Sequence, residues 1–457
     1  MNIVPQTSAE NQAFVTARRF CRDFKIGAGL KRANIQKING HSCLSVFQFV
    51  FGLVFSGRNL WRYLEREAAP FRKDTVYRLL NNPRYNWRIL LLLVARDVFG
   101  FLKPLTSDER KSVFVLDDSL YSRARSKAVE LLARVYDHAS HRFLKGFRLL
   151  TLGWSDGNTF IPVNFALLSS EKADNRLVDA DPTIDKRSSG FRRRRESVRK
   201  STEVLLDLVR QAGKAGLAAD YLLFDSWFAF PSVIRKIAAE SLHVICRLKE
   251  LRSIRFTYEG RSLSLNELYQ TVPKRRGRAR FFASATVDIG AGGQSVPARI
   301  VFIRDRERRG QWLALLSTDM ELPVEEIVRI YGKRWDIEVF FKMAKSHLCL
   351  ATEFQGRAYD MMVAHTTVVC LRYIMLALES RNSQDSRTVG GMFYQCCDEL
   401  EDLKFASALA RILAVLRDAM ENTLNASETV VAKLIENFFL SLPKSLQGLL
   451  KFSGCES

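Results

Sequence analysis

Hydrophobic residues recur at helical spacing through the first hundred residues of the chain. The pattern predicts helices over residues 45–55, 59–67 and 74–82. Gly57 separates the first two, and Asp74 is a suitable N-cap for the third. We therefore expect a helical region over residues 1–105. It could be a helix-turn-helix unit that reads DNA, or a small bundle whose cations are only solvated. The cations concerned are Arg58, Arg62, Arg72, Lys73 and Arg78.

The hydrophobic pattern changes near residue 112. A continuous apolar run over 112–119 contains β-branched residues and ends in two acids, which predicts a buried strand. Two strand-like runs within 147–169 meet at Asp156–Gly157, a hairpin signal. A helical pattern over 202–216 and a second buried strand over 219–226 follow. The order strand, hairpin, helix, strand is that of a ribonuclease-H-like fold.

Short strand patterns dominate residues 243–320, and a long helical pattern covers 322–348. We expect a mixed α/β protein with a ribonuclease-H-like catalytic core over 106–242. A β-rich insertion over 243–320 interrupts this core, and a core helix region over 321–375 completes it. Helical regions flank the core on both sides, a DNA-binding one over 1–105 and another over 376–457.

The charge of the chain points to a polyanionic partner. Lys and Arg total 70 against 49 acidic residues, a net charge of +21. Such an excess attracts nucleic acid, because each neutralised phosphate releases counterions. A ribosome-associated protein and a membrane-surface protein are the alternatives. The eight cysteines have no metal-site spacing, and we find no signal peptide or membrane span. We therefore expect a cytoplasmic protein without a membrane partner.

Three acidic residues are candidates for catalysis. Asp118, with Asp117 beside it, ends the first buried strand, and Asp225 ends the second. Sites in α/β sheets gather where strands meet their loops, although such an acid often only caps a turn. Glu338 is the third. Carboxylate oxygens are the ligands that Mg²⁺ prefers, and two such ions can drive phosphodiester displacement.

Glu338 belongs to a polar row on the predicted helix. Tyr331, Arg334, Glu338 and Lys345 lie within roughly 60° of one another on a continuous helix. A simple Arg334–Glu338 pair is the alternative, and Gly332 could bend the helix. Arginine and lysine at this edge are suited to holding phosphates.

The spacing of this row, Y-x2-R-x3-E-x6-K within YGKRWDIEVFFKMAK, resembles the Y-R-E-K signature of bacterial insertion-sequence transposases of the DDE class, the insertion-sequence-four-like family. VLDDS and LLFDSWF resemble that family's first and second Asp segments, and the similarity runs from about residue 112 to 375. The family carries a β-strand insertion between the second Asp and the Glu, where 113 residues separate Asp225 from Glu338 here.

The resemblance implies a cut-and-paste DNA transposase. Asp118, Asp225 and Glu338 would be catalytic and bind two Mg²⁺ or Mn²⁺ ions, with Asp117 as the alternative first ligand. Tyr331, Arg334 and Lys345 would contact the DNA. The partners would be double-stranded DNA, as terminal inverted repeats and target, and a second subunit in a homodimeric synaptic complex. The setting would be the bacterial cytoplasm, with the protein on the nucleoid when bound to DNA.

Two other functions stay open at this point. One is a structure-specific nuclease that cuts without strand transfer, and the other is a catalytically silent DNA-binding protein derived from a transposase. Weaker candidates for DNA contact are the basic runs 192–195 and 274–280, and the indoles of Trp227 and Trp335. For both indoles, core packing is the better expectation.

Overall fold

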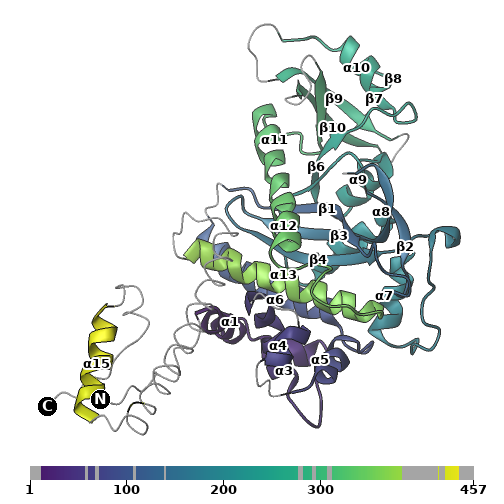
Figure 1. Ribbon diagram of the computed structural model, residues 1–457. Helices are drawn as coiled ribbons and strands as arrows, with labels where there is room; N and C mark the ends of the chain where they lie inside the picture. Colours follow the sequence, from purple (N-terminus) through teal and green to yellow (C-terminus); the bar gives the residue numbers. More distant parts are fainter. Residues whose placement is uncertain are drawn as a thin grey trace.

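The computed structural model describes residues 12–56, 60–66, 71–106, 110–137, 140–275, 281–290, 295–305, 311–382, 420 and 428–441 (Figure 1). A large mixed sheet runs through the molecule and continues into a β-rich part at the top of the view, with α-helices packed along it. One continuous cluster of buried apolar side chains joins the N-terminal helices, the sheet and the long helix that ends near residue 382.

The N-terminal region consists of helices, and the predicted segments correspond to α3 (Cys43–Leu53), α4 (Leu60–Arg66) and α5 (Lys73–Leu80). α5 begins before Asp74, so that residue lies in its first turn and not at the N-cap. α1 (Gln12–Asp23), α2 (Ile26–Arg32) and α6 (Trp87–Leu102) complete the region. α6 is mostly buried because it packs against both the sheet and the long helix. Gly57 and Arg58 lie outside the described residues.

Five strands form the core of the sheet in the order β4-β3-β1-β5-β6. They are β1 (Val113–Ser122), β3 (Arg142–Ser155), β4 (Phe160–Leu168), β5 (Tyr221–Phe224) and β6 (His243–Leu248). β3 runs antiparallel to β1 and β4, whereas β1, β5 and β6 are parallel. This is the arrangement of a ribonuclease-H-like fold, which confirms the predicted fold class. The short strand β2 (Ala133–Asp137) pairs with the beginning of β3.

The β3–β4 turn lies at the predicted Asp156–Gly157. Gly157 adopts a left-handed conformation, with φ of 84°. Oδ1 of Asp156 accepts hydrogen bonds from the backbone N–H groups of Asn158 and Thr159. The turn is therefore specified locally by an Asp and a Gly.

The strands of residues 243–320 extend the core sheet and do not form a sheet of their own. β6 pairs in parallel with β5, and β11 (Trp312–Ser317) then pairs antiparallel with β6. β10 (Val296–Arg304), β9 (Phe281–Ile289), β7 (Phe256–Tyr258) and β8 (Arg261–Leu263) continue outward, accompanied by helix α10 (Leu265–Thr271). β6 thus completes the core, although the sequence pattern groups it with the insertion.

Helices cover both faces of the core sheet. α12 (Trp335–Ser346) and α13 (Tyr359–Asn382) lie on one face, where the Phe160 ring contacts Phe340 and Tyr373. α8 (Ser201–Lys214) and α6 lie on the other, where Trp154 contacts Phe99 and donates to the Ala218 carbonyl. The remaining helices of the described part are α7 (Ser189–Ser197), α9 (Pro231–Ala238), α11 (Val324–Tyr331) and α15 (Glu428–Ser441).

Among the described helices, α13 is the one that is long and apolar enough to cross a membrane by length and composition. Its most apolar stretch is fully buried within the protein. In the sequence its apolar character is interrupted by Asp360, His365 and Arg372. Arg372 and His365 both bind the buried carboxylate of Glu353, at 2.7 and 2.8 Å. α13 is therefore a core helix whose charges are paired internally.

Candidate active site

Two of the predicted acidic segments lie side by side because their strands are parallel neighbours. β1 and β5 pair in register, with Val115 opposite Leu223. Two residues further on, this register brings Asp117 beside Asp225. Asp225 follows the last residue of β5, and its Oδ1 accepts the backbone N–H of Trp227 at 2.9 Å. Asp225 therefore lies at the carboxyl end of β5, whereas Asp117 and Asp118 lie in the middle of β1, which continues to Ser122 and does not end at these acids as the sequence pattern predicted.

β1 presents Asp117 to the face of the sheet that α12 covers. Arg334, which directly precedes α12, forms an ion pair with Asp117 at 3.5 Å and another with Glu338. Two residues further along β1, the Ser119 hydroxyl binds Nζ of Lys345 at 2.6 Å. Because side chains alternate along a strand, Asp117 and Ser119 share a face, and both meet this helix.

Asp118 points to the opposite face of β1. Its carboxylate pairs with Nε of Arg148 on β3 at 3.0 Å. The Arg148 guanidinium in turn lies over the ring of Trp227, 5.2 Å from its centroid. Of the two neighbouring acids, Asp117 is thus the one on the side of Glu338. The sequence left both open and ranked Asp118 first.

The polar row predicted on residues 331–345 is brought to one place. α11 ends at Tyr331, a 3₁₀ turn covers Gly332–Arg334, and α12 begins at Trp335. Gly332 has helical backbone angles, so the chain tightens by one turn without breaking its direction. The Arg334 guanidinium lies 5.8 Å from the centroid of the Tyr331 ring. All four residues of the row, Tyr331, Arg334, Glu338 and Lys345, line a single cleft.

This cleft has a volume of about 1290 Å³ and contains Asp117, Asp118 and Asp225 as well. Burial, together with repulsion from Asp225 and Asp118, raises the pKa of Asp117 to about 7. Burial also raises the pKa of Asp118 to about 6, against the opposing effect of Arg148. Burial lowers the pKa of Lys345. The three carboxylates of Asp117, Asp118 and Asp225 are therefore crowded in the cleft, and a bound cation would relieve the repulsion among them.

The donor set is suited to a hard divalent cation, because it consists of carboxylates and not of His or Cys. Among the residues that the structure describes, no three acidic, His or Cys side chains are grouped closely enough to hold a metal ion as they stand. Arg334 occupies the space between Asp117 and Glu338 and pairs with both. In this arrangement the Arg334 guanidinium is the positive charge that neutralises these two carboxylates.

Arg148 is a cleft residue that the sequence did not reveal. It lies on β3, inside a hydrophobic strand pattern, and reaches Asp118 only through the pairing of β1 with β3. No motif marks it, so the strand register is the signal that finds it. Trp227 was expected in the core but is 40% exposed and lines the cleft, and Trp335 is 63% exposed. Core packing was thus the wrong expectation for both indoles.

The basic run 192–195 is not a continuous phosphate-binding surface. Arg193 and Arg194 are buried, and both pair with Asp360, while Arg194 also pairs with Glu130. Helical periodicity on α7 turns two of the four guanidiniums inward to join it to α13. Arg192 and Arg195 remain exposed.

Two other groups of predicted DNA-contacting cations are only partly described. Lys274 and Arg275 lie over the rings of Tyr269 and Phe281, and residues 276–280 are outside the described part. In the N-terminal region, Lys73 lies over the Trp61 ring, whereas Arg58 and the side chain of Arg62 are outside it. A DNA-reading role for these cations stays a prediction.

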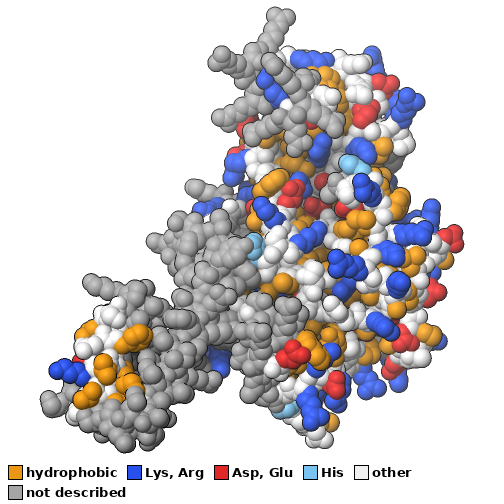
Figure 2. Space-filling view, in the orientation of Figure 1, with side chains coloured by type: hydrophobic (Ala, Val, Ile, Leu, Met, Phe, Trp, Pro, Cys, Tyr) orange, Lys and Arg blue, Asp and Glu red, His pale blue; other side chains and the backbone are white. Residues whose placement is uncertain are grey.

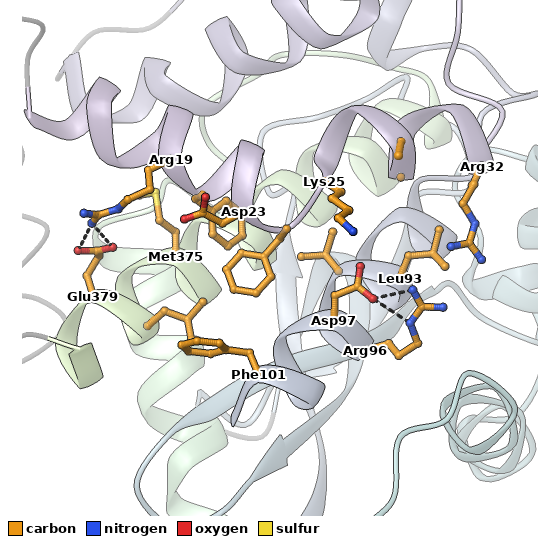
Figure 3. A pocket seen from close by; sticks show the side chains of 16 residues that line it. Arg19, Asp23, Lys25, Arg32, Leu93, Arg96, Asp97, Phe101, Met375 and Glu379 are labelled. Atoms are coloured by element: carbon orange, nitrogen blue, oxygen red, sulfur yellow. Dashed lines mark hydrogen bonds and ion pairs between the residues drawn. The ribbon is translucent and has the colours of Figure 1, made fainter. Parts of the chain in front are cut away.

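A second cavity, of about 610 Å³, lies among α1, α2, α6 and α13 (Figure 3). Arg19 of α1 pairs with Glu379 of α13, and Arg96 pairs with its neighbour Asp97 on α6. It contains none of the predicted catalytic residues. The cleft on β1 is therefore the candidate active site.

Comparison with known proteins identifies a family and a distant structural similarity. The model of the DDE superfamily endonucleases matches residues 53–291, just over half of the chain. The matched range includes Asp117, Asp118 and Asp225 but ends before Glu338, so the Y-R-E-K resemblance stays a prediction. No curated protein matches the chain. It is similar to the piggyBac transposase in a synaptic complex with hairpin DNA, with 10% identity and a TM-score of 0.46, over 98% of this chain and 87% of that one.

Proposed function

This chain belongs to the DDE superfamily of endonucleases, and we propose that it is a transposase that cuts DNA at the ends of its mobile element and joins them to target DNA. One observation carries the proposal. Carboxylates from β1, β5 and α12 share a single cleft with the row of Tyr331, Arg334 and Lys345, although more than a hundred residues separate each of these segments from the next.

The catalytic acids of this proposal are Asp117, Asp225 and Glu338, in place of the set that begins with Asp118. Three observations support Asp117. The β1–β5 register, continued two residues beyond Val115 and Leu223, places Asp117 beside Asp225. The Asp117 side chain faces α12, and the ion pairs of Arg334 connect it to Glu338. Asp118 is engaged on the other face by Arg148. Asp118 is then a positioning residue that orients Arg148 and Trp227 at the rim of the cleft.

The cofactor of the proposal is a pair of divalent cations, Mg²⁺ or Mn²⁺, held by Asp117, Asp225 and Glu338. Bound there, they would activate the attacking oxygen and stabilise the leaving oxygen. Arg334 would exchange its carboxylate partners for a DNA phosphate, because a guanidinium binds either oxyanion in the same bidentate manner. The resident ion pairs keep the acids neutralised until substrate and metal arrive.

Lys345 and Tyr331 complete the DNA-binding side of the cleft. Lys345 contributes a compact positive charge next to Ser119, and Tyr331 supports the Arg334 guanidinium with its ring. The partners in this proposal are the terminal inverted repeats, the target duplex and a second copy of the chain. The setting is the bacterial cytoplasm.

Lys345→Ala tests whether the row serves strand joining. Joining needs a second DNA placed precisely, whereas hydrolysis needs only water. We expect the variant to lower strand transfer of pre-cut element ends at least about tenfold, because one lost phosphate contact costs about 1–3 kcal/mol. Mg²⁺-dependent nicking of plain duplex should fall much less, because hydrolysis does not need a second DNA held in place. The assays are a strand-transfer reaction and a nicking reaction run in parallel.

Lys342→Ala is the matched control, because Lys342 is an exposed lysine on the same helix that does not line the cleft. Arg334→Ala is less informative, because it also removes the partner of two carboxylates. Equal losses in both reactions would favour a nuclease. Wild-type protein that nicks its own element ends but never joins them would refute the transposase.

A further inference from the structure

A second groove opens directly from the candidate active site. It has a volume of about 850 Å³ and shares Leu120 and Lys345 with the cleft. One wall is formed by Ser122 at the end of β1 and by the loop 123–129 that follows, and the other is the segment 350–357 between α12 and α13. We call it the β1-exit groove, since β1 runs from the carboxylates into it.

The β1-exit groove is lined by cations and by no acidic residue. Arg125, Lys127 and Arg357 are exposed, and within the described part of the chain none of them forms an ion pair or a side-chain hydrogen bond. Arg123 differs, because it donates to the Phe354 carbonyl at 3.3 Å and so joins the two walls. Unpaired cations facing one groove are an arrangement suited to a polyanion.

The walls of the groove are fixed to the core and to each other. The backbone N–H of Glu130 donates to the Arg357 carbonyl at 2.9 Å, and the Glu130 carboxylate accepts from Arg194 and from the Tyr359 N–H. Gly356 packs so closely on Met361 that a Cβ would lie 1.7 Å from its methyl group. The three free cations are therefore carried on an ordered frame, which lowers the entropy cost of binding.

We propose that the β1-exit groove binds the phosphodiester backbone of the duplex that flanks the scissile phosphate, an inference that rests on the proposed function. From Asp117 to the end of β1 at Ser122 the strand advances about 17 Å at ~3.3 Å per residue. That length corresponds to roughly five phosphate steps along one strand of a duplex. Lys345, at the boundary, lies where the backbone would pass from the cleft into the groove.

The test is the salt dependence of DNA binding by the full-length triple variant Arg125→Ala/Lys127→Ala/Arg357→Ala. With a 30-base-pair duplex in EDTA, so that nothing is cut, we expect the slope of log K against log salt to fall by about 3, close to one per lost phosphate contact. In Mg²⁺, we expect KM for nicking to rise at least about tenfold while kcat stays within about twofold, because these residues position DNA without touching the reacting atoms.

The control is Lys200→Ala/Lys214→Ala/Lys236→Ala, which removes the same charge from exposed lysines that line neither cavity. Its slope should change by less than about 1. The single variant Lys127→Glu keeps the rest of the groove intact and should lower the slope by about 1 or more. It tests the proposal even if the triple variant does not fold. A groove variant with the slope and KM of the control overturns the proposal. Wild-type protein that binds DNA with a steep salt dependence but never cuts it refutes the proposed function. In that case the difference in salt slope between the wild type and the groove variant still tests the groove proposal.

Discussion

At the scale of single residues, Asp117 and Asp118 show how one position along a strand changes a side chain's role. Asp117 faces α12 and is paired with Arg334, and Asp118 faces Arg148. The two carboxylates have similar burial and both have raised pKa values, so their environments differ mainly in their partners. Only Asp117 lies on the side where Glu338 and the other residues of the polar row, Tyr331, Arg334 and Lys345, gather.

Conservative amide substitutions test this distinction. We expect Asp117→Asn, Asp225→Asn and Glu338→Gln each to lower Mg²⁺-dependent cleavage by at least about 100- to 1000-fold, since each removes a charged ligand from a site that stabilises developing charge. DNA affinity in EDTA should stay within a few-fold. Asp118→Asn should retain cleavage within about tenfold, because it leaves all three proposed ligands in place.

The measurement is single-turnover cleavage of a labelled duplex, with each variant's thermal unfolding recorded as a folding control. Near-wild-type cleavage by any of the first three variants removes that residue from the proposed site. The reverse ranking, an inactive Asp118→Asn beside an active Asp117→Asn, would restore the set first suggested by the sequence.

At the scale of elements, α13 takes part in two ion pairs that differ in burial. Arg372 is fully buried and binds Glu353 as well as the carbonyls of Val50 and Phe51 in α3. Arg19 of α1 binds Glu379 near the other end of α13, with 45% of the Arg19 side chain exposed. Both contacts join α13 to the N-terminal helices, but only the first is shielded from water.

Removing the two arginines should therefore have unequal effects. Arg372→Met leaves the buried Glu353 without its main partner, and we expect a loss of about 3–5 kcal/mol in the free energy of unfolding. Arg19→Met, at a solvated pair, should cost less than about 1 kcal/mol. Urea denaturation gives both values from the shift in midpoint at unchanged slope. Similar losses for the two variants would show that burial does not control the strength of these contacts.

At the scale of the whole molecule, positive charge is distributed over much of the visible surface. The net charge is +21, and on the face shown in Figure 2 Lys and Arg side chains are scattered over the core and the insertion alike. A large duplex can therefore meet cations well beyond the cleft. Most of the binding free energy should come from phosphate contacts and should not depend on base sequence.

This distribution predicts a steep salt dependence for any duplex. If about 6–10 phosphates are contacted, affinity should fall by roughly 10³–10⁵ between 50 and 200 mM salt. Fluorescence anisotropy with an element-end duplex and a scrambled duplex of equal length measures the two slopes, which we expect to agree within about 2 units. A flat response for both would contradict DNA as the principal ligand.

The sequence by itself determined the types of the main elements and the positions of their acids. Buried strands produce continuous apolar runs, and an acid directly after such a run is visible without any structure, as at Asp117, Asp118 and Asp225. The row from Tyr331 to Lys345 was likewise visible, because helical spacing is a local property. The succession of strand, hairpin, helix and strand along the chain was also recognisable, since each element has its own sequence pattern.

The tertiary structure alone decided which side of each element meets which neighbour. A shift of one residue turns a strand side chain to the other face, so the choice between Asp117 and Asp118 depends on where α12 packs. Packing between distant segments likewise decides three other features. It buries Arg193 and Arg194 against Asp360, pairs β6 with β5 in the core, and brings Arg148 to Asp118 in the cleft. Contacts between segments far apart in the chain leave no local pattern, and they are what assemble the site.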